Sequence, residues 1–157
     1  MIDFEQIMLN IRNRVYRCIG SGSGRLVFDM GNEYVVKVAK NRRGIAQNEA
    51  EYRIASLSDN KLLAKVQEVS ADFRLLIMEK ADTIQNILSV FEYLNVRSKI
   101  EFIQLEEIRD ILYKHNLLLV DLYRPQNWGR INDRFVIIDY GYTQKVKNKY
   151  YSFFNIV

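Results

Sequence analysis

Three glycines at alternate positions, Gly20, Gly22 and Gly24, are the first residues in the sequence whose spacing suggests chemistry. Ser21 and Ser23 lie between them. Because glycine has no Cβ, such a segment can adopt positive φ, approach a ligand closely and present backbone N–H groups to an anion such as phosphate. A flexible Gly/Ser hairpin would have the same sequence, so the cluster alone leaves both interpretations open.

Lys37 is the next such residue, because it stands in the otherwise apolar segment 34–39. The apolar, largely β-branched side chains predict a strand there. An ammonium group that points inward from a buried strand needs an anionic partner. The lysine therefore favours phosphate binding by the glycine segment that precedes it.

Two aspartates and an asparagine form a third group. Asp121 follows the apolar run 117–120 and Asp139 follows the apolar run 135–138, and both runs predict short buried strands. Asn127 lies in the polar segment that follows Asp121. Carboxylate and amide oxygens at strand ends can converge on a divalent cation, and Mg²⁺ favours such ligands. Either aspartate taken alone would equally be explained as a turn cap.

The composition limits the architecture that positions these groups. At 157 residues and 48% hydrophobic content, the chain can build one core, arranged as one domain with two small lobes. Cys18 is the only cysteine, which excludes an intrachain disulfide and a cysteine-based zinc site. Basic and acidic residues are interspersed along the whole chain, and their net charge of +4 does not favour a nucleic-acid partner. With no secretory signal or long apolar run, we expect a cytoplasmic protein without a membrane partner.

The apolar periodicity divides the chain near Lys80. Before that point it predicts a helix at 3–12, strands at 15–19, 25–30 and 34–39, a helix at 45–57 after Gly44, and strands at 66–69 and 74–78. After it, the pattern predicts a helix near 84–91 and a longer helix from 100 to 112 that ends near His115. These elements indicate an α+β fold, with an antiparallel sheet and one crossing helix in residues 1–80 and a mainly helical part in residues 81–157.

The order of these motifs resembles the protein-kinase fold in miniature. A glycine loop, a strand lysine, a helix glutamate, Met-Glu at a strand end, an Asp-plus-Asn loop and Asp-x-Gly follow one another over nearly the whole chain. The chain is similar to short kinase-like proteins of bacteria and their phages. This resemblance implies a single domain, with residues 1–80 as the N-lobe and residues 81–157 as a reduced C-lobe. It also implies ATP and Mg²⁺ as cofactors and, for a phage-encoded protein, the host cytoplasm as the compartment.

The resemblance implies roles for residues of the N-lobe. Residues 20–24 correspond to the phosphate loop, and Lys37 corresponds to the lysine that binds the α- and β-phosphates of ATP. Glu51 is the expected helix partner of Lys37, with Glu49 as the alternative. Two residues apart, these glutamates face different sides of a helix, so only one can reach Lys37. Glu51 shares a face with Ile54 and should point toward the sheet.

The later motifs imply a second set of roles. Met78 resembles a gatekeeper residue, and the backbone of Glu79 to Ala81 would hydrogen-bond to adenine, although a plain buried strand would have the same sequence. Asp121 corresponds to the catalytic base that orients an acceptor hydroxyl. Asn127 and Asp139 correspond to the ligands of Mg²⁺.

Departures from the kinase pattern limit what it implies. Arg25 occupies the place of the third glycine, and the segment from Asp121 to Asn127 is one residue longer than in protein kinases. Leu119-Val120 stand where His-Arg would precede the catalytic aspartate, so activation by phosphorylation is not expected. Because few residues follow Gly141 in this sequence, we expect no lobe that docks peptides.

These departures favour a small-molecule acceptor or autophosphorylation over a docked protein substrate. The alternative function is a catalytically weak or inactive, pseudokinase-like module that binds a host or regulatory protein. The aromatic residues at 150–154 are expected to pack in the core.

Overall fold

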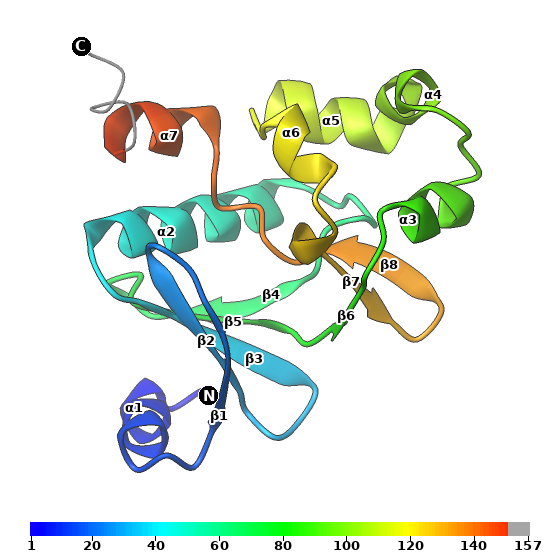
Figure 1. Cartoon of the computed structure of the whole chain (residues 1–157). Coiled ribbons are helices and arrows are strands. Elements are labelled where there is room, and N and C mark those ends of the chain that lie inside the picture. The colour runs from blue at the N-terminus through cyan, green and yellow to red at the C-terminus, as the bar shows by residue number, and fades with distance from the viewer. Residues whose placement is uncertain (151–157) are drawn as a thin grey trace. The chain divides into compact units, whose positions relative to one another are not determined.

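The computed structural model describes residues 1–150, which form two compact units (Figure 1). The first unit comprises Met1–Ser56 and Lys65–Lys80. The second comprises Leu57–Ala64 and the residues from Ala81 onward. The chain therefore leaves the first unit at Leu57, returns to it at Lys65 and leaves it again at Ala81.

The first unit contains, within the described residues, a five-stranded sheet in the order β1-β2-β3-β5-β4. Every neighbouring pair of strands is antiparallel. Gly31 has a φ of 77° and supplies the left-handed residue of the turn between the second and third strands. The predicted antiparallel sheet and α+β class are thus confirmed. The strands are β1 (Arg17–Ser21), β2 (Arg25–Asp29), β3 (Tyr34–Ala39), β4 (Val66–Val69) and β5 (Leu75–Glu79).

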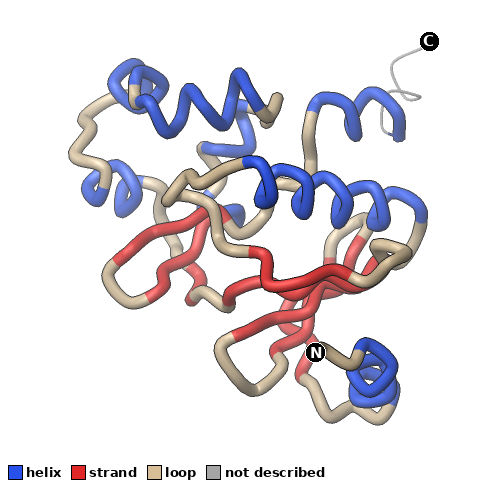
Figure 2. Tube along the Cα trace, turned by 180° about the vertical axis from the view of Figure 1, so that it is seen from behind, coloured by secondary structure: helices blue, strands red, loops and turns tan. Residues whose placement is uncertain are grey.

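Two helices cover opposite faces of this sheet, as the views from the front and from behind show (Figures 1 and 2). The helix α1 (Phe4–Arg12) packs Ile7 against a buried cluster that includes Val36. The helix α2 (Arg42–Leu57) lies on the other face. Because side chains alternate along a strand, Val36 points toward α1 and the next residue, Lys37, points toward α2.

The helix α2 begins earlier than predicted, at Arg42 rather than at Ile45. Gly44 does not separate the helix from the sheet, because it lies inside the first turn of the helix. A Cβ on Gly44 would overlap the Gly24 carbonyl oxygen, and a Cβ on Gly24 would lie 2.9 Å from the Gly44 nitrogen. These two glycines therefore let α2 and the glycine segment pack backbone against backbone.

The second unit contains a small antiparallel sheet in the order β6-β7-β8. The predicted strand at 135–138 is present as its last strand. Helices join and follow these strands within the described residues. The elements are β6 (Asp82–Thr83), α3 (Leu88–Tyr93), α4 (Lys99–Gln104), α5 (Glu106–Lys114), α6 (Leu119–Leu122), the 3₁₀ helix η1 (Pro125–Asn127), β7 (Trp128–Ile131), β8 (Arg134–Ile137) and α7 (Gln144–Tyr150).

The single helix predicted from 100 to 112 is wrong, because the structure divides this segment into α4 and α5. Leu105 lies between them with φ −61° and ψ 135°, an extended conformation that ends one helix and precedes the other. Phe102 and Ile108, on either side of the break, are both buried. The apolar spacing continues across the break, so periodicity alone did not reveal it.

The strand predicted at 117–120 is also wrong. Leu117 makes an isolated bridge to Thr143, and the chain then enters α6, so Asp121 lies in a short helix rather than at the end of a strand. Val120 is 57% exposed, whereas Leu122 is buried. So short an apolar run cannot distinguish a strand from a helical turn, because both periodicities fit it.

No helix among residues 1–150 is long and apolar enough to cross a membrane. Tyr150, the last described residue, ends α7 and is partly buried. The other aromatic residues predicted to pack in the core, from Tyr151 to Phe154, lie outside the described residues.

Candidate functional site

The glycine segment, residues 20–24, comprises the last two residues of β1 and the turn that leads to β2. The connection between β3 and α2 fixes its backbone. The Lys40 N–H donates to the Gly24 carbonyl at 2.8 Å, and the Asn41 side-chain amide donates to the Ser23 carbonyl at 3.1 Å. The segment is therefore an ordered turn, and its binding of phosphate remains a prediction.

The positive φ values expected for the glycine segment are absent. Among the described residues, Gly31 is the only glycine with a positive φ. Gly24 is required instead for close approach to α2, and a Cβ on Gly20 would make an ordinary 3.5 Å contact with Val27. A Cβ on Gly22 would meet no atom within 4 Å, so the tip of the turn is open to the approach of a ligand.

Lys37 and Glu51 form a buried ion pair. The Lys37 ammonium donates to Glu51 Oε1 at 2.9 Å and to Oε2 at 3.0 Å. The two residues are 4% and 0% exposed. Glu49, the alternative partner, instead forms a surface ion pair with Arg53 at 2.6 Å. The expected pairing of Lys37 with Glu51 is present, while its catalytic role remains a prediction.

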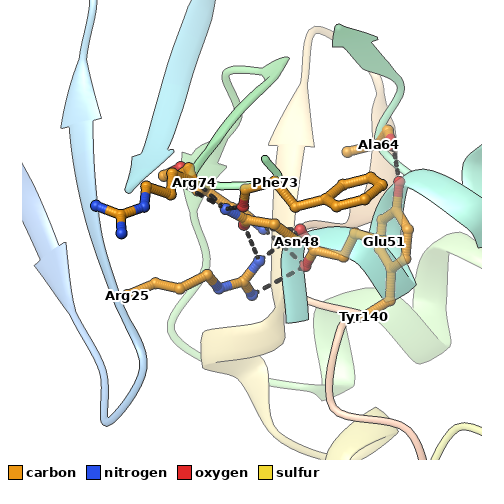
Figure 3. A network of polar contacts seen from close by, with 8 residues as sticks. Arg25, Asn48, Glu51, Ala64, Phe73, Arg74 and Tyr140 are labelled. Atoms are coloured by element: carbon orange, nitrogen blue, oxygen red, sulfur yellow. Dashed lines mark hydrogen bonds and ion pairs between the residues drawn. The ribbon is translucent and has the colours of Figure 1, made fainter. Parts of the chain in front are cut away.

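Arg25 binds the same carboxylate, which was not predicted from the sequence. Its guanidinium donates from Nη1 to Glu51 Oε2 at 2.7 Å and from Nη2 to Oε1 at 3.0 Å (Figure 3). Nη1 also donates to the Asn48 side-chain oxygen at 3.1 Å. Arg25 is 6% exposed, so the residue in the third-glycine position points into the interior of the first unit.

Asn48 anchors these groups to the sheet. Its amide donates to the Phe73 carbonyl at 2.8 Å and to the Arg74 carbonyl at 3.2 Å (Figure 3). The side chain is completely buried, so its hydrogen bonds replace those that it would make to water. We call the set of Arg25, Lys37, Asn48 and Glu51 the buried cation cluster.

The charges of the buried cation cluster determine the state of its carboxylate. Burial alone would raise the pKa of Glu51, but the positive charges of Arg25 and Lys37 outweigh this effect and lower the pKa to about 2. Glu51 is therefore ionised at neutral pH. Because two cations bind one carboxylate, Glu51 would still face a positive charge if either cation moved away.

The pairing of β2 with β3 contains a signal that could have revealed the inward-facing position of Arg25. Val27 pairs with Lys37 across β2 and β3, and Arg25 pairs with Ala39. Paired residues share a face of the sheet, and the faces alternate along each strand. Arg25 and Lys37 therefore lie on the same face, the one toward α2. The periodicity placed Arg25 at the start of a strand, but the resemblance drew attention to it only as the residue in the place of the third glycine.

The segment predicted to contact adenine, residues 78–81, makes hydrogen bonds of its own. Met78 is completely buried in β5. The N–H groups of Glu79 and Lys80 donate to other backbone carbonyls at 3.0 Å and 2.9 Å. Ala81 begins the second stretch of the second unit. Contacts to a base would therefore have to use other backbone groups of this segment, and the prediction remains open.

The second unit brings Asp121, Asn127 and Asp139 together. The Asn127 amide donates to the Asp121 backbone carbonyl at 3.0 Å, and the Asn127 carbonyl accepts a hydrogen bond from the Ile138 N–H at 2.8 Å. Asp139 therefore directly follows Ile138, which is hydrogen-bonded to Asn127. The additional residue in this segment does not separate Asn127 from Asp121. We call these three residues the aspartate–asparagine cluster.

Two buried aromatic side chains fix the backbone around this cluster. Trp128 is completely buried and donates from Nε1 to the Leu122 carbonyl at 2.9 Å. Tyr140, which follows Asp139, is 1% exposed, and its hydroxyl donates to the Ala64 carbonyl at 2.7 Å (Figure 3). Each ring is buried while its polar atom is hydrogen-bonded, so both contribute to holding the two loops in place.

The Asp121 carboxylate, 14% exposed, has an unusual environment. Burial raises its pKa, and the charge of Asp139 raises it further, against the opposing charges of Arg124 and Lys147. Arg124 Nη1 lies 3.5 Å from Asp121 Oδ1. The negative charge of Asp139 thus disfavours the ionised form of Asp121. The sequence did not indicate Lys147, because nothing in its spacing relates α7 to Asp121.

Asn127 and Asp139 offer oxygen atoms of the kind that Mg²⁺ binds. In the part of the chain that the structure describes, no group of three or more His, Cys, Asp or Glu residues could hold a metal ion. Mg²⁺ does not require such a group, because it keeps several waters and takes one or two protein oxygens together with substrate phosphates. The Asn127 Nδ2 is engaged by the Asp121 carbonyl, which leaves the side-chain oxygen as the donor atom. The residues present therefore fit Mg²⁺.

No model of a protein family matches the chain. No curated protein matches it either. Among solved structures, the chain is similar to the streptomycin-ATP-APH(2")-IIa ternary complex, with a TM-score of 0.47 and 17% sequence identity over 90% of this chain and 72% of the other. This similarity is too weak to assign the chain to a family.

Proposed function

We propose that the chain is an ATP- and Mg²⁺-dependent phosphotransferase with a reduced protein-kinase-like domain. The observation that carries the proposal is the buried ion pair of Lys37 and Glu51. Lys37 lies on β3, which pairs with the strand that leaves the glycine segment. A strand lysine held by a helix carboxylate, next to an ordered glycine turn, is suited to binding nucleotide phosphates.

In this proposal, residues 1–157 form one kinase-like domain, with residues 1–80 as the N-lobe and residues 81–157 as a reduced C-lobe. The glycine segment and Lys37 bind the phosphates, and Glu51 orients Lys37. The backbone of residues 79–81, beside Met78, contacts the base. The cytoplasm, where ATP is available, is the proposed compartment.

The proposed chemistry of the second unit is transfer of the γ-phosphoryl group to a hydroxyl. The hydroxyl oxygen forms a bond to the γ-phosphorus, the bond from that phosphorus to the bridging oxygen breaks, and ADP leaves with the electron pair. Asp121 accepts the proton of the hydroxyl. Its raised pKa makes it a better proton acceptor near neutral pH than an ordinary aspartate. Asn127 and Asp139 would hold Mg²⁺, which neutralises phosphate charge when bound.

The proposed acceptor is a small-molecule hydroxyl or a hydroxyl of the chain itself. Transfer to the chain itself requires no docking surface for a protein substrate, so it can be tested without knowing the acceptor. The full chain is incubated with Mg²⁺ and ATP labelled at the γ-phosphate, and label in the protein and in added small alcohols is measured. We expect incorporation by the native chain and a loss of at least about 100-fold in Asp121→Asn and Asp139→Asn.

Asp133→Asn is the matched control, because Asp133 is a fully exposed aspartate in the turn between β7 and β8 of the same unit. It should transfer label at the native rate. Undiminished transfer by Asp121→Asn and Asp139→Asn would contradict the proposed mechanism.

The alternative is a pseudokinase-like module that binds a host or regulatory protein. The two proposals differ in their response to nucleotide, because a ligand of the native state raises the melting temperature by mass action. A shift with millimolar ATP and Mg²⁺ but no transfer to any acceptor would support a nucleotide-binding module. The absence of any shift, together with a defined complex with a host protein, would support a module that does not use ATP.

A further inference from the structure

Arg25 belongs to the buried cation cluster, yet the proposed function gives it no role. Two nitrogens of its guanidinium donate to the two oxygens of Glu51, at 2.7 Å and 3.0 Å. Arg25 is 6% exposed, so water competes little for these hydrogen bonds. A planar guanidinium that donates two parallel hydrogen bonds fixes both the place and the plane of a carboxylate, which the compact ammonium of a lysine does not. Arg25 therefore restricts where the Glu51 carboxylate can lie.

Asn48 fixes Arg25 in turn. Its side-chain oxygen accepts from Arg25 Nη1 at 3.1 Å, and its amide donates to the backbone carbonyls of residues 73 and 74 (Figure 3). Asn48 and Glu51 are three residues apart in α2, so they lie on the same face of the helix. The helix face that carries Glu51 is therefore attached to the sheet at two places, at β2 through Arg25 and at the turn before β5 through Asn48.

Lys37 reaches the same carboxylate from β3. Its ammonium lies 2.9 Å and 3.0 Å from the two oxygens of Glu51, so each oxygen accepts from both cations. Phosphates that bind to Lys37 bring negative charge toward a carboxylate whose ionised form is already disfavoured by burial. A second cation on Glu51 offsets this effect, because it favours the ionised carboxylate whether or not a phosphate is bound.

We propose that Arg25 is a positioning residue that holds the Glu51 carboxylate in place, so that the Lys37–Glu51 pair stays intact while Lys37 binds the phosphates of a nucleotide. This inference rests on the proposed function, in which Glu51 orients Lys37. In this role Arg25 acts through Glu51 rather than on the nucleotide. Without Arg25, only Lys37 would oppose the effect of burial on Glu51, and protonation of Glu51 would remove the group that orients Lys37.

The test is the affinity of the full chain for ATP with Mg²⁺, measured by calorimetry at pH 8 and at pH 6 in the native protein, Arg25→Met and Arg25→Lys. In Arg25→Met the carboxylate is less firmly held, so binding at pH 8 should be about 10-fold weaker than in the native chain. Burial raises the pKa of Glu51 and the charge of Arg25 lowers it, so the pKa should rise in this variant. Its deficit relative to the native chain should therefore grow by at least about 3-fold at pH 6. Arg25→Lys keeps a cation there, and its deficit should be the same at both pH values.

The pH dependence distinguishes positioning from a merely structural role. The cations that hold Glu51 are Arg25 from β2 and Lys37 from β3, and Lys37 is present in every protein compared. Loss of packing alone would weaken binding equally at the two pH values, because it would not change the charge around Glu51. Protonation of ATP affects the native chain and the variants alike, so it cancels in the ratio of their affinities.

A matched control comes from the same helix. Arg53 and Glu49 form an ion pair on α2 in which the arginine side chain is 68% exposed, and the residue types are those of Arg25 and Glu51. Arg53→Met removes the same charge from this surface pair and should bind ATP with native affinity at both pH values. If it weakens binding as much as Arg25→Met does, the effect is not specific to the buried position and the inference is overturned.

The outcomes separate this inference from the function on which it rests. A native chain that does not bind ATP overturns both. A native chain that binds, with no loss in Arg25→Met or with a deficit that is equal at the two pH values, overturns the inference alone. Should Arg25→Met fail to fold, Arg25→Gln replaces it, since glutamine can still donate a hydrogen bond to Glu51 but carries no charge. It should show the same growing deficit at pH 6, and a constant deficit contradicts the inference.

Discussion

The buried cation cluster and the aspartate–asparagine cluster hold their charged groups in different ways. In the first, the charged side chains bind one another, and Glu51 is 0% exposed with a cation on each side. In the second, a backbone carbonyl and the Asn127 amide hold the loop, while Asp121 and Asp139 repel each other. The first cluster should therefore contribute to folding stability, whereas the second can lose a charge without loss of stability.

The largest expected effect is that of Glu51→Gln on stability. The substitution leaves Arg25 and Lys37 buried without their shared carboxylate, and breaking a buried ion pair from one side costs about 3–5 kcal/mol. Urea denaturation of the full chain measures the free energy of unfolding. Glu49→Gln, on the exposed side of the same helix, should change it by less than about 1 kcal/mol. Equal losses in the two variants would contradict the difference between buried and surface pairs.

The next largest effect is that of Asp121→Asn, which should lower activity without lowering stability. Phosphoryl transfer should fall by at least about 100-fold, because the proton acceptor is lost. The melting temperature at pH 7 should stay the same or rise, since the ionised Asp121 is disfavoured by burial and by Asp139. Label transfer and thermal unfolding are measured on the same sample. A drop in melting temperature like that of Glu51→Gln would show that both clusters are structural.

A smaller effect distinguishes two positions within the glycine segment. A Cβ on Gly24 would lie 2.6 Å from Gln47 Oε1 and 2.9 Å from the Gly44 nitrogen, so Gly24→Ala must displace α2 or the turn. We expect a loss of about 1–3 kcal/mol in the free energy of unfolding. Gly22→Ala meets no atom within 4 Å and should change stability by less than about 0.5 kcal/mol. The reverse order would mean that the glycines serve conformation rather than packing.

The smallest expected effect is a pH dependence of opposite sign in the two clusters. The pKa of Glu51 falls from its ordinary 4.5 to about 2 on folding, so its contribution to stability is complete above pH 4.5 and is lost as the pH falls toward 2. The pKa of Asp121 is raised from 3.8, so its ionisation lowers stability as the pH rises through the folded value. Denaturation of the native chain and of Asp121→Asn from pH 3 to 7 tests this. The variant should gain relative to the native chain with rising pH, and parallel curves would contradict the assignment.

The sequence predicted the first unit well because its pattern is strong. Apolar, largely β-branched segments such as residues 34–39 indicate strands, and the succession of such segments along the chain indicated the antiparallel sheet. The spacing of Glu49 and Glu51 also separated the buried glutamate from the exposed one, since residues two apart face different sides of a helix. These features follow from local periodicity, which a sequence displays directly.

The errors occurred where short segments or tertiary contacts decide the structure. The apolar run 117–120 was too short to distinguish a strand from α6, and the break at Leu105 leaves no trace in the apolar spacing. Gly24 was assigned a role in backbone conformation, and Gly44 was assigned the role of separating the helix from the sheet. Both are instead required because their backbones pack directly against each other. Arg25 was interpreted as a departure from the phosphate-loop motif. Its side chain lies on the same face of the sheet as that of Lys37, and there it binds Glu51.

The most direct test of the central claim is the binding of ATP with Mg²⁺ to the native chain, Lys37→Met and Lys65→Met, measured by calorimetry. Circular dichroism confirms that each variant is folded. Lys65 is an exposed lysine of the same unit and serves as the control for loss of one positive charge. The account predicts saturable binding to the native chain and to Lys65→Met, and a loss of about 100-fold in a folded Lys37→Met. Equal affinity in all three proteins, or no binding to any of them, would contradict it.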